Sequence, residues 1–167
     1  MSAPVREFEL SVHAYSNELY RYAYWLTKHP SDAEDLVQDC FQRAWRSWHT
    51  LKNEKAVKQW LFAILRHEFL RRFEKERPEF SSLDEHLELP AIGVAEDDIL
   101  ALRQAIQQAP VSLRDPFLLQ VLGGFSCEEI AQIENTTPGA VMTRLTRARQ
   151  WFRNFLNPVS IGKESQR

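Results

Sequence analysis

The chain has 167 residues, of which 44% are hydrophobic and 26% are charged, proportions that are typical of a globular protein and exclude wholesale disorder. Its formal net charge is -2, so binding to nucleic acid would have to come from charges that are unevenly placed along the chain. The N-terminus has no apolar run of signal-peptide length and no stretch approaches about 18 apolar residues, so we expect a cytoplasmic protein without membrane insertion.

The first half of the chain predicts three helices. Residues 8–28 carry apolar side chains at helical spacing, in one helix or two, and this segment ends near Pro30 because proline disfavours helix in the preceding residue. Ser31 and Glu34 form a capping-box pattern, which predicts that a second helix runs from Asp32 to about Trp48. After a polar connector, a third helix is expected over residues 56–77.

The third predicted helix combines an apolar stripe with basic residues and interleaved aromatics. This mixture is typical of surfaces that bind single strands or melted duplex, where bases stack on aromatic rings and phosphates pair with Lys and Arg. The alternative is that the aromatic side chains Trp60, Phe62 and Phe69 belong to the core. Composition leaves both interpretations open.

Acidic residues and helix breakers dominate the following segment. Residues 78–98 hold seven acids and no Lys or Arg, together with Pro78, Pro90 and Gly93. We therefore expect a flexible acidic linker over residues 78–95 that joins a domain of residues 5–77 to a domain of residues 96–157. The linker is either a solubilising spacer or a strand that lies in a basic channel of a partner.

The second domain is expected to begin with two helices. The first is closed by Pro110. Ser112 is interpreted as the N-cap of the next helix, with Asp115 at its third position, and Gly123-Gly124 end it.

Residues 125–154 predict a helix-turn-helix. Ser126 and Glu129 form a capping box, Asn135 suits the left-handed corner, and Thr137 caps a second helix that starts at Pro138. Four arginines and no acid follow between Pro138 and Asn154. Such a second helix normally enters the DNA major groove, whereas the alternative is a solvated basic face.

Metal and catalytic sites are not expected. His67-Glu68 resembles the start of a zinc HExxH motif, but Arg71 occupies the position of the second histidine. There is no Gly-rich phosphate loop, no GxSxG and no Cys/His set of metal spacing, so we expect neither an enzyme nor a bound cofactor. Cys40 and Cys127 lie in helical apolar patterns, which predicts reduced, buried thiols rather than a disulfide or redox switch.

Three stretches together resemble the extracytoplasmic-function (ECF) group of bacterial sigma factors in the sigma-70 family. They are DAEDLVQDCFQRAWRSW (residues 32–48), QWLFAILRHEFLRRF (residues 59–73) and GFSCEEIAQIENTTPGAVMTRLTRARQ (residues 124–150). The resemblance covers about residues 10–155. It implies an all-α fold of two small helical domains, the second containing the helix-turn-helix, in a non-enzymatic protein that directs RNA polymerase to promoters.

The resemblance also implies a role for particular residues. One group matches the part that docks on the clamp helices of the largest polymerase subunit, a second matches the part that captures the melted -10 element, and a third falls where the family reads the -35 element. The second domain would bind the flap of the second-largest polymerase subunit. An anti-sigma factor would keep the free protein from binding RNA polymerase. The three groups are, in that order, Asp35, Gln38, Asp39 and Phe41; Trp60, Arg66, His67, Arg71 and Arg72; and Thr137, Thr143, Arg144, Arg147 and Arg149.

Three positions depart from the family pattern. His67 stands where Asn is usual, Met142 where Lys or Arg is common, and Glu134-Asn135 where Leu-Gly is usual. These departures affect promoter choice rather than mechanism. The alternative functions are a stand-alone helix-turn-helix regulator with an N-terminal dimerisation or sensor domain, and a protein-binding adaptor, which leaves the arginine-rich helix unexplained.

Overall fold

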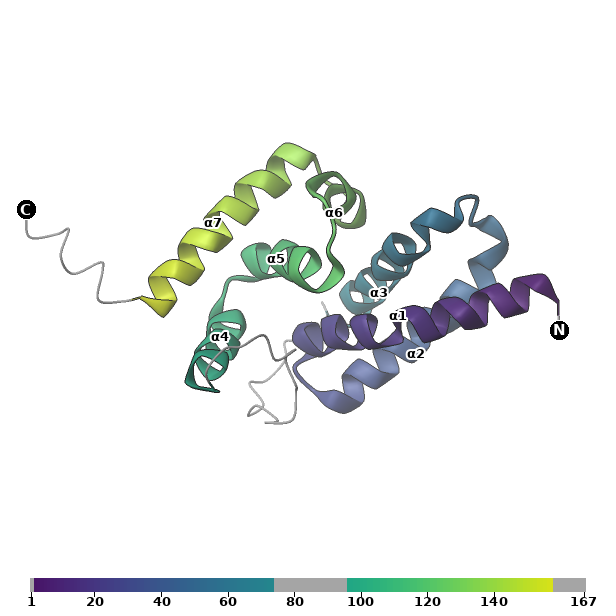
Figure 1. Ribbon diagram of the computed structural model, residues 1–167, viewed down its shortest axis with the longest axis horizontal. Helices are drawn as coiled ribbons and strands as arrows, with labels where there is room; N and C mark the ends of the chain where they lie inside the picture. Colours follow the sequence, from purple (N-terminus) through teal and green to yellow (C-terminus); the bar gives the residue numbers. More distant parts are fainter. Residues whose placement is uncertain (1, 74–95, 158–167) are drawn as a thin grey trace, which may run out of the picture.

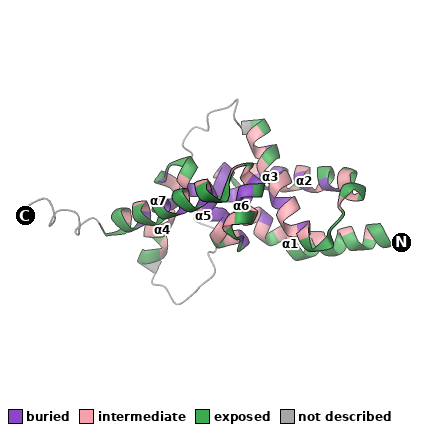
Figure 2. Ribbon diagram, turned by 90° about the horizontal axis from the view of Figure 1, so that it is seen from above, coloured by how far each residue is buried: buried purple, intermediate pink, exposed green. Residues whose placement is uncertain are grey.

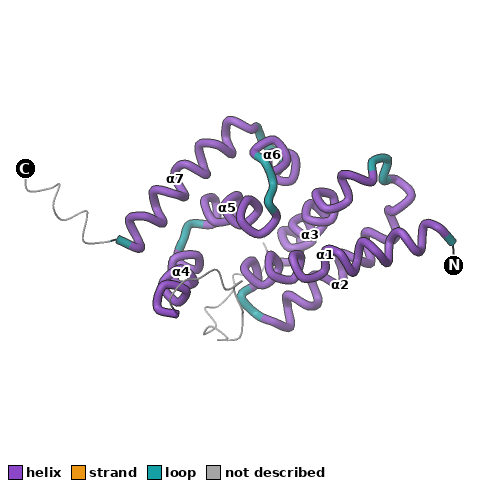
Figure 3. Tube along the Cα trace, in the orientation of Figure 1, coloured by secondary structure: helices purple, strands orange, loops and turns teal. Residues whose placement is uncertain are grey.

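The computed structural model describes residues 2–73 and 96–157 of the chain. Within these ranges all regular structure is helical, in two groups that lie side by side along the longest axis (Figures 1 and 3). None of the described helices is long and apolar enough to cross a membrane. The predicted acidic linker, residues 78–95, lies outside the described residues, as do residues 74–77 of the third predicted helix.

The first group consists of three helices that pack on one another: α1 (Ala3–Thr27), α2 (Pro30–Ser47) and α3 (Val57–Phe73). Two short 3-10 turns, Trp48–Thr50 and Glu54–Ala56, join α2 to α3. The first predicted helix is therefore a single one, and it ends where Lys28 adopts a left-handed conformation with φ of 59°. The core of this group contains Leu19, Tyr22, Leu36, Cys40, Leu61, Phe62 and Leu65.

The start of α2 differs from the prediction. Its N-cap is His29 and its first residue is Pro30, and no side chain caps the helix, so the capping box of Ser31 and Glu34 was wrong. The fixed φ of proline suits the first helical position, where its missing N–H is not needed. The helix consequently starts two residues earlier and places Ser31 inside its first turn.

The second group consists of α4 (Glu96–Gln108), α5 (Val111–Gly123), α6 (Cys127–Glu134) and α7 (Pro138–Leu156). Helix α7 packs against the other three. The two groups also contact each other, because α5 packs on α1 and α6 packs on α3. Figure 2 shows the buried residues gathered in the middle of the molecule, around α3, α5 and α6, whereas both ends are largely exposed.

Helix α5 also begins earlier than predicted. Pro110 is its N-cap and Val111 its first residue, so Ser112 is not the cap. Asp115 consequently lies in the second turn, where its side chain is buried instead of reaching the free backbone N–H groups of the first turn. This carboxylate contacts residues of the first group, as described below.

The two cysteines are free thiols. Cys40 is buried in the core of the first group, where burial, together with the charge of Glu68, raises the pKa of its thiol to about 12. A thiol in this state is a poor nucleophile, since the thiolate is the reactive form. Cys127 is only half-buried, so the prediction of a buried thiol is confirmed for Cys40 alone.

Candidate nucleic-acid interface

The helix-turn-helix forms as its sequence predicts. The Ser126 hydroxyl accepts a hydrogen bond from the Glu129 N–H at 3.2 Å, and the Glu129 carboxylate accepts one from the Ser126 N–H at 3.0 Å. Asn135 is left-handed with φ of 54° and ψ of 53°, and the Thr137 hydroxyl accepts from the Ala140 N–H at 3.2 Å. Local capping therefore fixes the start of α6, the corner and the start of α7.

Helix α7 divides into a buried and an exposed face. Val141, Leu145, Ala148 and Phe152 form the buried stripe, as predicted. The opposite face carries residues expected to contact the -35 element, and among them Thr143, Arg147 and Arg149 are exposed. The Thr143 hydroxyl donates to the Gly139 carbonyl at 3.0 Å, so this side chain is oriented along its own helix.

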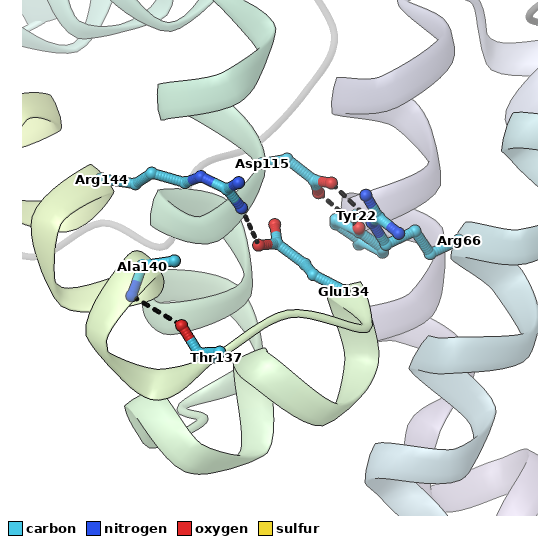
Figure 4. A network of polar contacts seen from close by, with 7 residues as sticks. All are labelled: Tyr22, Arg66, Asp115, Glu134, Thr137, Ala140 and Arg144. Atoms are coloured by element: carbon cyan, nitrogen blue, oxygen red, sulfur yellow. Dashed lines mark hydrogen bonds and ion pairs between the residues drawn. The ribbon is translucent and has the colours of Figure 1, made fainter.

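Arg144 differs from the other arginines of α7 because it has a buried partner. Its Nη1 atom lies 3.3 Å from Oε2 of Glu134, whose side chain is only 3% exposed. Arg149 makes a longer contact, 3.4 Å from its Nη2 atom to Oε1 of Gln120. The Glu134–Arg144 pair therefore links the last residue of α6 to the middle of α7 (Figure 4).

The residues expected at the -10 element are not gathered on one face of α3. Trp60 is half-buried and its ring lies 6.0 Å from that of Trp48, whereas His67 is exposed. Phe62 is fully buried and Phe69 half-buried, so the core interpretation is confirmed for Phe62. Arg66 is directed toward α5, where its Nε lies 2.7 Å from Oδ2 of Asp115.

The last turns of α3 carry a cluster of ion pairs with α2. Glu68 is 1% exposed and pairs with Arg43 of α2 and with Arg71, the latter at 2.9 Å. Arg72 pairs with Asp39 of α2 at 2.6 Å. The cluster thus holds an excess of positive charge at a surface that α2 and α3 share.

The residues expected to bind polymerase lie on α2 in different environments. Asp35 and Gln38 are exposed, and Asp39 is half-buried against Arg72. Phe41 is half-buried and meets the Phe8 ring edge-on at 6.4 Å, so it also packs α1 onto α2. Of the four residues expected to bind polymerase, Asp35 and Gln38 are therefore the two that are fully exposed.

A polar cluster joins the two groups of helices, and the reasoning from sequence did not identify it. Tyr22 of α1, which is fully buried, donates its hydroxyl proton to Oδ1 of Asp115 at 2.6 Å, while Arg66 of α3 binds Oδ2. We call Tyr22, Arg66 and Asp115 the interdomain cluster (Figure 4). Asp115 thus receives both hydrogen bonds from the first group of helices although it belongs to the second.

Burial in this region shifts several pKa values. Burial raises the pKa of Tyr22 well above its ordinary value, with further contributions from the charge and the hydrogen bond of Asp115. Burial and the negative charge of Asp115 raise the pKa of Glu134 to about 7, although Arg66 and Arg144 oppose the shift. Glu134 is therefore divided between its charged and neutral forms near neutral pH.

No group of three or more His, Cys, Asp or Glu side chains within residues 2–73 and 96–157 is arranged to hold a metal ion. The polar features of this surface are accordingly hydrogen bonds and ion pairs among protein side chains.

Comparison with known families accounts for both groups of helices. Residues 12–79 match Sigma-70 region 2, and residues 99–152 match Sigma-70, region 4. The RNA polymerase sigma factor SigV of Bacillus subtilis strain 168 is 31% identical, covering 83% of this chain and 84% of its own length. The ECF RNA polymerase sigma-E factor of Escherichia coli K12 is 31% identical over 77% of this chain and 75% of its own.

Solved structures have the same fold. The sigma factor RpoE from Bartonella quintana, in complex with the anti-sigma factor NepR, superposes with a TM-score of 0.78 at 26% identity and covers 91% of this chain and 98% of its own. CnrH, in complex with the cytosolic domain of CnrY, gives a TM-score of 0.70 at 21% identity, with coverage of 90% and 88%.

Proposed function

The chain belongs to the sigma-70 family as an ECF RNA polymerase sigma factor, and from this membership we propose which of its surfaces perform each step of promoter-specific initiation. The protein directs RNA polymerase to promoters and is not an enzyme. Its N-terminal module is a region 2 domain rather than the dimerisation or sensor domain of a stand-alone regulator.

We propose that α7 reads the -35 element in the major groove. The support is its exposed face, which includes Thr143 and Arg147, on a helix whose opposite stripe is buried in packing. Thr137 at the N-terminal end, Arg144 and Arg149 complete the proposed contacts. A good bidentate contact of this kind discriminates against the wrong base by about 1–3 kcal/mol.

The -10 element is proposed to bind along α3. Unstacking a base costs a few kcal/mol, which aromatic and polar groups at the capture site must offset. Half-buried Trp60 and exposed His67 are the proposed base contacts, with Arg66, Arg71 and Arg72 supplying positive charge for the strand. Base stacking on an aromatic ring contributes about 1–3 kcal/mol.

Helix α2 is the proposed docking surface for the polymerase core. Exposed Asp35 and Gln38, with Asp39 and Phe41 beside them, would contact the clamp helices of the largest subunit, and the region 4 domain would contact the flap of the second-largest subunit. The proposed site of action is the cytoplasm, where polymerase and promoter meet.

We also propose that an anti-sigma factor binds this chain. The support is the similar RpoE of Bartonella quintana, whose structure contains the anti-sigma factor NepR. The acidic linker, which is proposed to follow the nucleic-acid path through the polymerase, would be withheld from polymerase in such a complex.

The arginine-rich exposed face of α7 is the observation that carries the proposed DNA contacts. Promoters would be selected from a random library with polymerase core and the purified protein, and transcription from them measured. Arg144→Ala with Arg147→Ala should lower transcription from -35-dependent promoters by at least roughly 30-fold, because two base contacts of about 1–3 kcal/mol each are lost and every 1.4 kcal/mol is about tenfold. Binding to the core should not change, and the exposed Arg6→Ala on α1 is the matched control.

Two results would contradict these assignments. Unchanged transcription by the double variant would remove Arg144 and Arg147 from -35 reading. Similarly, unchanged core binding by Asp35→Ala with Asp39→Ala would remove α2 from polymerase docking.

A further inference from the structure

A pocket of about 600 Å³ lies where the end of α1 meets the corner between α4 and α5. Its wall is apolar in part, with Leu26 of α1 and Pro110 and Val111 at the start of α5. Two cations, Lys28 and Arg114, also line it, whereas none of the described residues that line it is acidic. The pocket therefore combines an apolar wall with an excess of positive charge.

Arg114 is buried beside this pocket without a full set of partners. It is 6% exposed, and its Nε atom has no hydrogen-bond partner among the described residues. The adjacent carboxylate of Asp115 is already engaged, because its two oxygens bind Tyr22 and Arg66. Charged side chains are almost never buried unless they are paired, since removal of a charge from water is costly. The unpartnered guanidinium nitrogen thus points to an anion from outside the chain.

Lys28 brings a second cation to the pocket. Its left-handed backbone conformation, with φ of 59°, ends α1, and its Nζ atom donates to the Gln107 carbonyl of α4 at 3.4 Å. Burial and then the positive charge of Arg114 lower the pKa of Lys28, so the two cations repel each other. An anion that contacts both would offset this repulsion.

The first turn of α5 adds partial positive charge at the same place. Pro110 is the N-cap, and no side chain caps the helix. The Pro110 carbonyl accepts the N–H groups of Leu113 at 3.0 Å and Arg114 at 2.9 Å, whereas those of Val111 and Ser112 have no acceptor within the helix. Such N–H groups at a helix N-terminus bind phosphates and other anions.

The combination of features favours a phosphate ester with a small apolar body. A phosphate monoester carries about two negative charges at neutral pH and has three strong acceptor oxygens, enough for a guanidinium, an ammonium and helix N–H groups together. A carboxylate has one charge and two oxygens. The Val111 side chain is 61% exposed, so an apolar body that covers it would remove apolar surface from water.

We propose that this pocket binds a small phosphate monoester, whose phosphate contacts Arg114, Lys28 and the first turn of α5. The apolar body of the ligand lies against the wall that includes Leu26 and Val111. None of the residues proposed above to contact promoter DNA is among the described residues that line the pocket. The ligand site is therefore separate from those contacts, and it does not depend on the functions proposed for them.

Isothermal titration calorimetry with the purified full-length chain tests the chemistry of the ligand. The probes are phenyl phosphate, inorganic phosphate, and methyl phenyl phosphate, a diester with a single charge like the phosphates of a nucleic-acid backbone. Phenyl phosphate should bind about tenfold more tightly than inorganic phosphate, because its ring covers the apolar wall. It should also bind about tenfold more tightly than the diester, because it has one more negative charge to pair. Absence of phenyl phosphate binding, or an affinity no higher than that of either other probe, would overturn the proposal.

Removal of each cation locates the site. Arg114→Met keeps an unbranched apolar stem in the buried position and should weaken phenyl phosphate binding roughly 10- to 100-fold, the effect of losing a hydrogen bond to a charged group. Lys28→Met should weaken it several-fold. Arg6→Met, an exposed position near the start of α1, is the matched control and should bind as the wild type does. Wild-type affinity in both pocket variants would overturn the proposal.

A further measurement decides the matter if Arg114→Met does not fold, which circular dichroism would reveal. In amide NMR spectra of the wild type, phenyl phosphate should shift the signals of Val111 and Ser112 and leave that of Gly139 on α7 in place. Lys28→Met should need several-fold more phenyl phosphate for the same shift. Binding that leaves Val111 and Ser112 unchanged would place the ligand elsewhere and contradict the assigned pocket.

Discussion

The guanidinium of Arg72 on α3 lies 2.6 Å from the carboxylate of Asp39 on α2. One ion pair thus joins a residue proposed to capture the -10 element to a residue proposed to dock on polymerase. Both side chains are partly exposed, at 43% and 30%, and ion pairs of this kind typically stabilise a fold by only about 0.2–1 kcal/mol. The pair therefore matters more for the orientation of the two side chains than for stability.

Replacement of Asp39 separates these two effects. We expect Asp39→Asn to change the free energy of unfolding by less than about 1 kcal/mol, since the pair is exposed to solvent. The free energy of binding to the polymerase core should change by more than the free energy of unfolding, because Asp39 is a proposed contact with polymerase. Urea titration and binding to labelled core measure the two quantities, and Glu9→Gln on α1 serves as the control. Equal small effects on both would show that Asp39 only pairs with Arg72.

Glu68 is expected to matter for stability instead. Its carboxylate is 2% exposed and pairs with Arg43 and Arg71, whose exposed guanidinium groups stay solvated if the carboxylate is lost. Glu68→Ala should lower the free energy of unfolding by about 1.5–3 kcal/mol, the usual net contribution of a hydrogen bond between charged groups. A urea denaturation curve checks this value. A urea midpoint equal to that of the wild type would show that the buried carboxylate makes no net contribution to the stability of the fold.

The helix-turn-helix could be predicted from sequence because its determinants are local. The capping box of Ser126 and Glu129, the left-handed Asn135 and the cap at Thr137 each act within three residues along the chain. The same kind of inference failed at Ser31 and Ser112. Pro30, one residue before Ser31, is the first residue of α2, and Pro110, two residues before Ser112, is the N-cap of α5, so each helix begins before the serine could cap it.

The interdomain cluster could not be predicted because it joins distant parts of the chain. Tyr22 and Asp115 are separated by 93 positions, and no local pattern relates them. A weaker signal was available: Asp115 stands in a strongly apolar helix, and Glu68 is the sole acid of α3. Charged residues are almost never fully buried unless they are paired, so each isolated acid indicated a partner without identifying it.

Gly123 allows Phe125 to reach the domain interface. A Cβ atom at Gly123 would overlap the Phe125 ring, which itself packs against Phe62. Gly123→Ala should therefore destabilise the protein by about 1–3 kcal/mol through overpacking. Gly139→Ala is the matched control, because a Cβ there meets nothing within 4 Å and the position lies in α7. This control should be neutral or more stable by up to about 1 kcal/mol.

Thermal unfolding of the two alanine variants measures the difference. The melting temperature should fall for Gly123→Ala and stay level or rise for Gly139→Ala. If the melting temperatures of both variants shift in the same direction by the same amount, overlap with the Phe125 ring is not the reason that position 123 requires glycine.

Glu134 is expected to make stability depend on pH. Its pKa in the folded protein is about 7, against an ordinary value of 4.5, because burial and Asp115 disfavour the charged carboxylate more than Arg66 and Arg144 favour it. Between these two values the folded state holds a proton that the unfolded state has lost. The stabilising contribution is therefore fully present below about pH 4.5 and is lost as the pH rises toward 7.

The free energy of unfolding should consequently decrease from pH 5 to pH 7.5, with a contribution from Glu134 of at most about 1.4 kcal/mol per pH unit, the limit for a single proton. Glu134→Gln imitates the neutral carboxyl group and should flatten this part of the profile, whereas Glu128→Gln, an exposed position on α6, should retain it. Urea titrations at four pH values give the slopes, and the comparison with each variant cancels the contribution of all other titrating groups. If Glu134→Gln kept the wild-type slope, its carboxyl group would be no more protonated in the folded chain than in the unfolded one.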